Sequence, residues 1–272
     1  MIDTHAHLTG MFCDLPTGRQ AGKGVVEEAK MARLWAIVLA ASNIEESVEN
    51  IKLAKNYDGF LFAAAGIHPQ QTDVENKDSI DKQIAHLDEL IGKNKKNIVA
   101  VGECGLDYSP APAGEKDRSR RGQEKLFRKQ ICLSMKYKLP LIIHARKAMD
   151  QVIEILSEYK NLKGVFHCYA GGKKRIKKVL GLGEDWYFGI DGNLTYDDGL
   201  VEVVKKIPRD RLILETDSPL LTPEPFRGKE NKPAYVKYVY KKVSEIWGVE
   251  FKECEKLIDE NARKMFGINP SS

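Results

Sequence analysis

Short apolar runs alternate with longer amphipathic stretches along most of the chain. Eight of the runs are short and rich in β-branched residues, as buried parallel strands are. They cover residues 1–6, 34–41, 60–66, 97–102, 139–144, 163–168, 186–190 and 211–216. Between most of them apolar residues recur at helical spacing, as Ile80, Ile84, Leu87 and Ile91 do. Eight alternations of strand and helix favour a closed parallel (β/α)8 barrel over an open, doubly wound sheet.

Length and composition agree with one domain of this kind. The chain has 272 residues, of which 42% are hydrophobic and 30% charged, so it can bury a large core without disulfides. Barrels of this type reach that size as one domain, and we expect a single TIM-barrel domain over residues 1–272. The net charge of +4 permits an anionic substrate but is too small to indicate nucleic-acid binding.

The cysteines, at positions 13, 104, 132, 168 and 254, are scattered and form no Cys-x-x-Cys pair. This pattern is typical of reduced thiols rather than of a disulfide framework or a structural zinc site. No apolar run approaches the ~18 residues of a membrane span, and the first residues do not resemble a signal peptide. We therefore expect a cytoplasmic protein without membrane association or an obligate protein partner, and a monomer in the simplest case.

Polar residues gather at the ends of the predicted strands. His5 and His7 stand two apart, so on a strand both point to the same side. The other strand ends carry His68, Glu103, Asp107, His144, Arg146, His167, Glu215 and Asp217. The remaining histidine, His86, lies off the apolar stripe of its helix, and we expect it to be exposed. Because a barrel gathers its strand ends around one mouth, five imidazoles and several carboxylates should converge there.

Metal coordination accounts for such a cluster better than structural use does. Buried imidazoles and carboxylates each need partners, and a metal supplies them at once. The number of ligands suggests two ions, and imidazole with carboxylate suits Zn, Mn, Co or Ni better than Mg. Two neighbouring ions lower the pKa of a shared water and stabilise attacking and leaving oxygens, which suits hydrolysis of phosphate esters, amides or esters.

Taken together, the motifs resemble the TatD family of metal-dependent hydrolases and deoxyribonucleases, within the amidohydrolase-like barrels. The resemblance runs nearly end to end and rests on DTHAHL, GIHP, GECGLDY, PLIIHAR, GVFHCYAG, LETDSPLLTPEPFRGKENKP and NARKMFG. It implies a (β/α)8 fold and a two-metal nuclease that trims DNA, in the first instance a 3′–5′ exonuclease. Family members are often described with Mg, so the metal stays open among Zn, Mn, Mg and Co.

The resemblance also implies roles for single residues. One ion would be held by His5, His7, Glu103 and Asp217. The other would be held by Glu103, His144 and His167. Glu103 would bridge the ions, and Asp217 would orient or deprotonate the attacking water, which makes these two the catalytic residues. The substrate side would be lined by His68, Arg146, Tyr169, Arg227 and Lys229.

Several residues keep two interpretations. His68 precedes a proline, so it could form a turn as readily as contact substrate. Asp3 could support a ligand or fill a layer of the barrel, and Glu215 could orient a ligand or pair with a basic residue. Asp107 is expected to stabilise the loop over residues 107–122. Two thiols beside the ligands are expected to pack behind the site because strand residues alternate sides: Cys104 and Cys168.

Three functions compete. The first is a two-metal phosphodiesterase acting on DNA ends. The second is a hydrolase of another bond, such as an aminoacyl ester of tRNA or a small amide. The basic residues after the fifth and eighth strands favour phosphate-bearing substrates modestly. The third, a binding protein on an old enzyme scaffold, is disfavoured because it has no need of six costly ligands. A Gly-rich loop over residues 9–24 could alter substrate choice.

Overall fold

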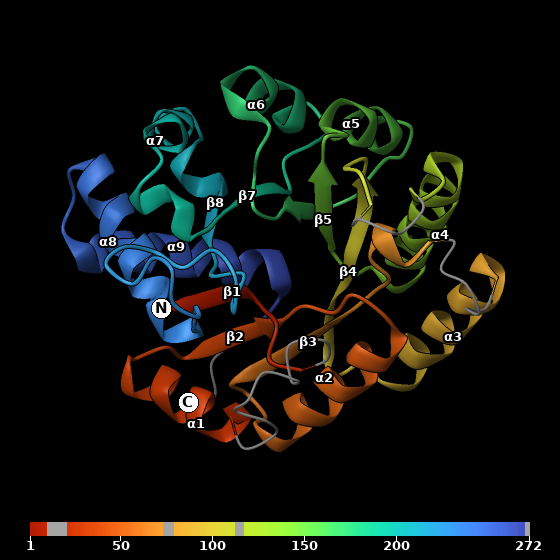
Figure 1. The fold of residues 1–272 in the computed structure, drawn as a ribbon, viewed down its shortest axis with the longest axis horizontal. Coiled ribbons are helices and arrows are strands. Elements are labelled where there is room, and N and C mark those ends of the chain that lie inside the picture. The colour runs from red at the N-terminus through yellow and green to blue at the C-terminus, as the bar shows by residue number, and fades with distance from the viewer. Residues whose placement is uncertain (10–20, 73–78, 112–116, 270–272) are drawn as a thin grey trace.

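The computed structural model describes residues 1–9, 21–72, 79–111 and 117–269. Eight parallel strands follow one another in a single sheet in the order β1 to β8, with helices around it (Figure 1). The strands are β1 Ile2–Ala6, β2 Ala36–Leu39, β3 Leu61–Ala65, β4 Ile98–Asp107, β5 Leu141–Arg146, β6 Gly164–Phe166, β7 Trp186–Ile190 and β8 Leu212–Leu214. The helices are α1 Ala21–Met31, α2 Ile44–Asn56, α3 Ile80–Lys93, α4 Arg120–Tyr137, α5 Met149–Ser157, α6 Gly172–Leu180, α7 Asp198–Val204, α8 Val236–Trp247 and α9 Phe251–Phe266.

The first strand closes the sheet against the segment that follows the last. The backbone N–H of Asp217 donates to the carbonyl of His5 at 2.9 Å, and that of His7 donates to Ser218 at 2.8 Å. The hydroxyl of Thr4 donates to the carbonyl of Leu214 at 3.0 Å. The predicted (β/α)8 barrel is therefore confirmed.

Strand side chains alternate between two apolar layers. Ile37 and Leu39 of β2 belong to the layer between the strands and the surrounding helices. Val38 and its counterparts on the other strands, such as Tyr187, pack with one another inside the barrel. Helix α9 adds Phe266 to this inner layer, and its Asp259 accepts a hydrogen bond from the backbone of Ile2 at 3.1 Å. Helix α9 thus covers the amino end of the barrel, which leaves the carboxyl end for a site.

Some element boundaries differ from the prediction. Strand β4 continues to Asp107, because Cys104 and Leu106 are fully buried and the strand stays paired with β5 as far as Arg146. Residues 21–24, expected in a loop, begin α1, where two glycines concealed the helical pattern. Residues 10–20 of the first expected loop and residues 112–116 of the second lie outside the described residues. No helix in the described ranges is long and apolar enough to cross a membrane.

Candidate metal centre

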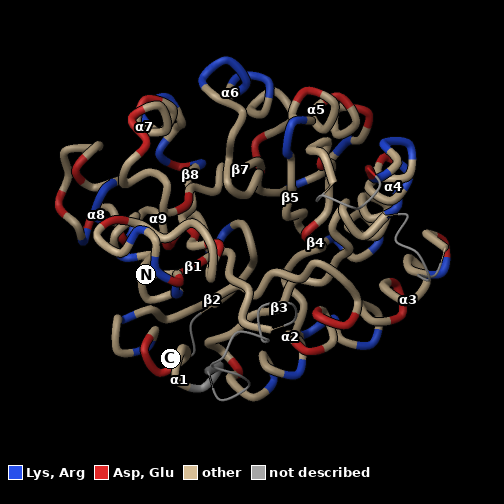
Figure 2. Tube along the Cα trace, viewed as in Figure 1, with Lys and Arg blue, Asp and Glu red and all other residues tan. Residues whose placement is uncertain are grey.

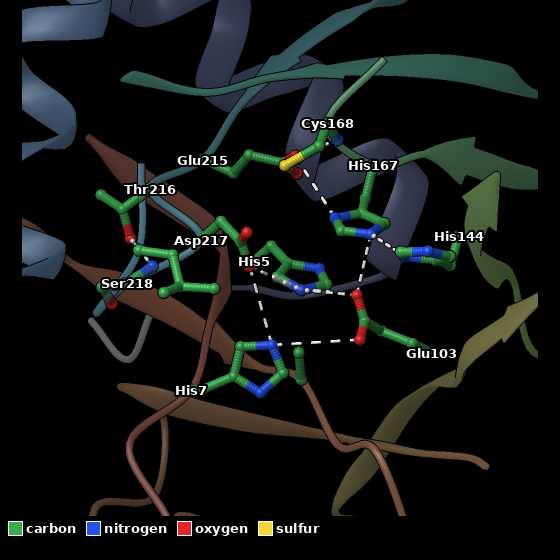
Figure 3. A network of polar contacts seen from close by, with 12 residues as sticks. His5, His7, Glu103, His144, His167, Cys168, Glu215, Thr216, Asp217 and Ser218 are labelled. Carbon is green, nitrogen blue, oxygen red and sulfur yellow. Dashed lines mark hydrogen bonds and ion pairs between the residues drawn. The ribbon is translucent and has the colours of Figure 1, made fainter. Parts of the chain in front are cut away.

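Side chains from the carboxyl ends of the strands converge at one mouth of the barrel (Figure 3). They come from β1, β4 and β5 and from the segments that follow β1, β6 and β8. The converging residues are His5, His7, Glu103, His144, His167 and Asp217. His144 is partly exposed and the other five are buried. The six residues predicted as ligands therefore lie together, and their role as ligands remains a prediction.

Glu103 lies at the centre of the cluster. Its Oε1 is 2.8 Å from Nε2 of His167 and 3.1 Å from Nε2 of His5. Its Oε2 is 4.0 Å from Nε2 of His7. Burial alone would raise the pKa of this carboxyl, but His167 and His5 hold it well below its ordinary value. Glu103 is thus a buried carboxylate shared by several imidazoles, as a ligand that bridges two ions would be.

Two glycines allow β4 to run close to β5 on either side of Glu103. A Cβ on Gly102 would lie 2.6 Å from the Cβ of Ile142. Gly105 has a φ of +139°, and a Cβ there would lie 2.0 Å from the carbonyl oxygen of His144. The GECG sequence therefore provides the carboxylate and also the close approach of the two strands that carry Glu103 and His144.

Asp217 approaches both histidines of the first strand. Its Oδ1 is 3.6 Å from Nε2 of His5 and 3.7 Å from Nε2 of His7. The rings of His5 and His167 stack with their centroids 4.2 Å apart. Despite this crowding, neither ring nitrogen of His5 has a well-directed hydrogen bond within the described part of the chain. A buried ring nitrogen without a hydrogen bond is costly. A cation bound at Nε2 of His5, which faces Glu103 and Asp217, would satisfy that nitrogen, so this donor set fits a metal.

Five groups of donor atoms among the described residues are compact enough to hold an ion, and two of them consist entirely of predicted ligands. The donor atoms of His5, His7 and Glu103 lie within 4.8 Å of one another, and so do those of Glu103, His144 and His167. Both groups combine imidazole nitrogen with carboxylate oxygen, a set that suits Zn, Mn or Co. Because the groups share Glu103, they would form one centre rather than two separate sites.

The protonation of the imidazoles depends on their position in the cluster. Burial lowers the pKa of His5 to about 3, so this ring is neutral at neutral pH. Burial also opposes charge on His7 and His167, but neighbouring carboxylates outweigh it and raise their pKa values to about 9 and about 10. Protons and cations compete for the same nitrogens, so metal binding at this centre should strengthen as the pH rises.

Comparison with known proteins places this centre in a family. A sequence model described as TatD related DNase matches residues 2–267. The chain belongs to the TatD family. It is 36% identical to YabD of Bacillus subtilis, described as an uncharacterized metal-dependent hydrolase, over 99% of this chain and all of that one. It is 32% identical to a 3′-5′ ssDNA/RNA exonuclease TatD of a Rahnella strain, over 90% of this chain and 92% of that protein.

Solved structures give the same family. The crystal structure of YJJV, a TatD homologue from Escherichia coli, superposes with a TM-score of 0.86. The two chains are 27% identical, and the match covers 99% of this chain and 98% of that one. The barrel and its closure are therefore those of a TatD-family protein over nearly the whole length.

Sequence reasoning missed one carboxylate of this TatD-family centre. Glu46 of α2 is buried, and its Oε1 lies 3.2 Å from Nδ1 of His7. Its backbone N–H donates to the side chain of Asn43, which caps the helix, at 2.8 Å. An Asn with Glu three positions later is a helix-start pattern. That pattern could have placed Glu46 at the first turn of α2, but not against His7.

Asp3 and Glu215 support the segments that carry the ligands. Asp3 is fully buried and accepts hydrogen bonds from the backbone N–H and the hydroxyl of Thr216, at 2.9 and 2.6 Å. It thereby ties β1 to the residue before Asp217. Glu215 accepts a hydrogen bond from the backbone N–H of Cys168 at 2.5 Å and lies 3.8 Å from Nδ1 of His167. Neither acid pairs with Lys or Arg among the described residues.

The two cysteines beside the ligands differ from each other. Cys104 is fully buried among apolar residues, as predicted. Cys168 was expected to pack behind the site, and this is wrong: its sulfur lies within 4.8 Å of donor atoms of His167 and Asp217. Strand β6 ends at Phe166 and Cys168 has a φ of +43°, so strand alternation no longer decides which way its side chain points. Figure 3 shows the sulfur beside Glu215.

His68 has one of the two roles that the sequence left open, because it forms a turn, and its contact with substrate remains a prediction. It caps a short 3-10 helix, Pro69–Gln71, because its Nδ1 accepts from the backbone N–H of Gln70 at 3.1 Å. Its ring centroid also lies 4.3 Å from that of His144. His68 therefore forms a turn and borders the metal centre at the same time.

The other residues predicted to bind substrate divide into exposed and buried ones. Arg146, Arg227 and Lys229 are exposed, and the guanidinium of Arg227 lies 4.1 Å from the ring centroid of Tyr196. Tyr169 is only 2% exposed, packs edge-on against Phe188, and donates its hydroxyl to the carbonyl of Gly172. These are contacts of a core residue, so the structure does not group Tyr169 with the exposed basic residues. Helix α6 carries further Lys and Arg residues, as Figure 2 shows.

Proposed function

We propose that the protein is a divalent-metal-dependent nuclease that hydrolyses phosphodiester bonds at the 3′ ends of single strands. The observation that carries this proposal is the set of buried imidazoles around one shared carboxylate, Glu103. Membership of the TatD family supports it, and so does the similarity to a protein described as a 3′-5′ ssDNA/RNA exonuclease. The unpaired state of the four described cysteines supports the expectation of a reducing, cytoplasmic compartment.

The proposed ligands form two sets that share Glu103. His5, His7, Glu103 and Asp217 would hold one ion. Glu103, His144 and His167 would hold the other. Bound ions would polarise a phosphoryl oxygen and lower the pKa of an attacking water. Zn, Mn and Co suit the imidazole-rich set best, and Mg is the remaining candidate.

Asp217 is proposed to accept the proton of the attacking water. Burial raises its pKa to about 6, so the side chain is a carboxylate at neutral pH and its affinity for a proton is higher than that of an ordinary aspartate. Only 8% of its surface is exposed, which limits exchange of that proton with bulk water. Asp217 would therefore act as ligand and general base in one position.

His68 is proposed to donate a hydrogen bond to the substrate. Burial lowers its pKa to about 3, so the ring is neutral at neutral pH. Its Nδ1 accepts a hydrogen bond from Gln70, so the single ring proton is on Nε2. A neutral donor beside the metal centre can bind a phosphate oxygen without adding another charge, and the exposed Arg146 at the end of β5 can add a charge-assisted contact.

The proposal can be tested with metal-stripped protein. Chelator treatment should remove activity on end-labelled single-stranded DNA, and adding back Zn, Mn, Co or Mg singly should restore it and identify the preferred ion. Crystals soaked in Zn, Mn or Co should show two anomalous peaks on either side of Glu103. Double-stranded DNA and charged tRNA serve as parallel substrates. Restoration on charged tRNA alone would assign the centre to an ester hydrolase instead.

Replacing Arg227 and Lys229 by Ala is expected to raise KM for DNA and weaken its dependence on salt. Both side chains are exposed in the segment after β8 that follows Asp217, where they can contact phosphates. The slope of log affinity against log salt is negative, and each lost phosphate contact on a single strand reduces its magnitude by about 0.7, or about 1.4 for the pair. Binding titrations at several salt concentrations measure the slope, and metal content should not change.

The matched control replaces Lys95 and Lys96, which are exposed just before β4 at the amino end of the barrel. This variant loses the same charge far from the mouth and should keep the wild-type slope. An unchanged slope in the Arg227/Lys229 variant would remove this segment from the nucleic-acid interface.

A further inference from the structure

A carboxylate of helix α2, that of Glu46, contacts the ring nitrogen of His7 that points away from the other proposed ligands. Nδ1 of His7 lies 3.2 Å from Oε1 of Glu46, whereas its Nε2 faces Asp217 and Glu103 at 3.7 and 4.0 Å. The other oxygen of Glu46 accepts the backbone N–H of Ser42 at 2.7 Å. Glu46 is only 3% exposed, so it is anchored at both oxygens away from water. A carboxylate only accepts, so it keeps a proton on Nδ1 of His7. When the ring is neutral, as it must be to bind a metal, the lone pair is therefore on Nε2.

His144 has the same arrangement with its two nitrogens exchanged. Its Nε2 lies 3.2 Å from Oδ2 of Asp107, and its Nδ1 lies 3.2 Å from Nε2 of His167. The other oxygen of Asp107 accepts the backbone N–H of Ser109 at 2.9 Å. Asp107 therefore does stabilise its loop, as predicted, but it also faces the outer nitrogen of a proposed ligand.

His68 shows the opposite arrangement. Nδ1 of His68 accepts a hydrogen bond from the backbone N–H of Gln70, where the other two histidines face a carboxylate. The ring proton of neutral His68 is therefore on Nε2. A protonated ring nitrogen has no lone pair for a metal. The group formed by His68, Asp107 and His144 is compact enough for an ion, but this hydrogen bond makes His68 a donor rather than a ligand.

We infer that Glu46 is a positioning residue that fixes the orientation and the tautomer of His7, so that Nε2 is presented to a metal ion. Asp107 holds His144 in the same way. This inference rests on the proposed metal centre and adds to it a residue from α2, outside the strand ends. Carboxylates that hold the second nitrogen of a histidine ligand typically contribute 10- to 100-fold to metal affinity.

The test is the substitution Glu46→Gln. The amide can still accept from Ser42, but its NH2 group then faces Nδ1 of His7 and donates to it. The ring proton is thereby moved to Nε2, the nitrogen meant for the metal. We expect the affinity for zinc, measured by competition with a chromophoric chelator, to fall about 10- to 100-fold. The melting temperature of the metal-free protein should change little.

The matched control is Glu45→Gln. Glu45 is the preceding residue of α2, is exposed, and loses the same charge in the same helical turn. It should bind zinc as the wild type does. Glu46→Ala provides a second comparison: it removes the carboxylate without supplying a competing donor, so it should weaken binding less than Glu46→Gln does.

The outcomes separate this inference from the proposed function. If the wild type binds zinc and Glu46→Gln binds it as tightly as Glu45→Gln does, the positioning role is wrong and the metal centre stands. If Glu46→Gln weakens binding only in proportion to a lowered melting temperature, Glu46 is a structural residue and the inference is equally overturned. If the wild type binds no divalent ion, the proposed function fails and this inference fails with it.

Discussion

Replacing Glu103 by Gln is expected to abolish hydrolysis and weaken the binding of both ions. Its Oε1 lies within 3.1 Å of ring nitrogens on His5 and His167, so one side chain serves both proposed ligand sets. An amide keeps the shape but loses the charge and one acceptor. Metal ions contribute several kcal/mol to such reactions, so turnover should fall by about 10³-fold or more. Turnover and the metal content per chain are the measurements.

The control for Glu103 is Glu184→Gln, the same change at an exposed position just before β7, at the amino end of the barrel. That variant should keep both turnover and metal. If Glu103→Gln binds two ions per chain with wild-type affinity, Glu103 does not bridge them and the two-ion proposal has to be withdrawn.

Asp217→Asn is expected to separate metal binding from catalysis. The variant keeps the ligand set of Glu103, His144 and His167, so at least one ion should remain bound. It loses the carboxylate proposed to accept the proton of water, and general base catalysis typically contributes about 10²- to 10⁴-fold. We therefore expect kcat to fall by about that factor. Single-turnover rates at saturating metal, together with metal content, measure the two effects independently.

The matched control for Asp217→Asn is Asp197→Asn, the same change at an exposed position. Asp197 is exposed and caps α7 by accepting from the backbone N–H of Leu200, a role that Asn fills equally well. It should keep wild-type kcat. Full metal occupancy with normal kcat in Asp217→Asn would remove Asp217 from the mechanism and leave the general base unidentified.

The fold was predictable because strands and helices bury different patterns of apolar residues. Strands buried on both faces are apolar throughout, whereas the helices are apolar on one face only, and their alternation determined the barrel. The boundaries were less predictable. Strand β4 extends beyond its apolar run because its pairing with β5 continues past Glu103. Strand β6 ends at Phe166, so the side chain of Cys168 can point toward the site.

The candidate site was predictable to the extent that it lies at strand ends. A closed barrel brings those ends together whatever the details, so the convergence of His5, Glu103 and His144 followed from topology. Glu46 did not follow, because its contact with His7 depends on how α2 packs against β3 at the outside of the barrel. Asp107 was assigned to its loop alone for a similar reason: its distance to His144 depends on the β4–β5 register.

The seam between the first strand and the segment after the last has a thermodynamic consequence. The hydrogen bonds that close the barrel there involve the backbones of His5, His7 and Asp217, three of the four residues proposed to hold one ion. An ion bound by these three side chains would join the two ends of the sheet, so metal affinity and resistance to local opening become linked quantities. Amide hydrogen exchange along this seam would then slow when metal binds, with little change on the far side of the barrel.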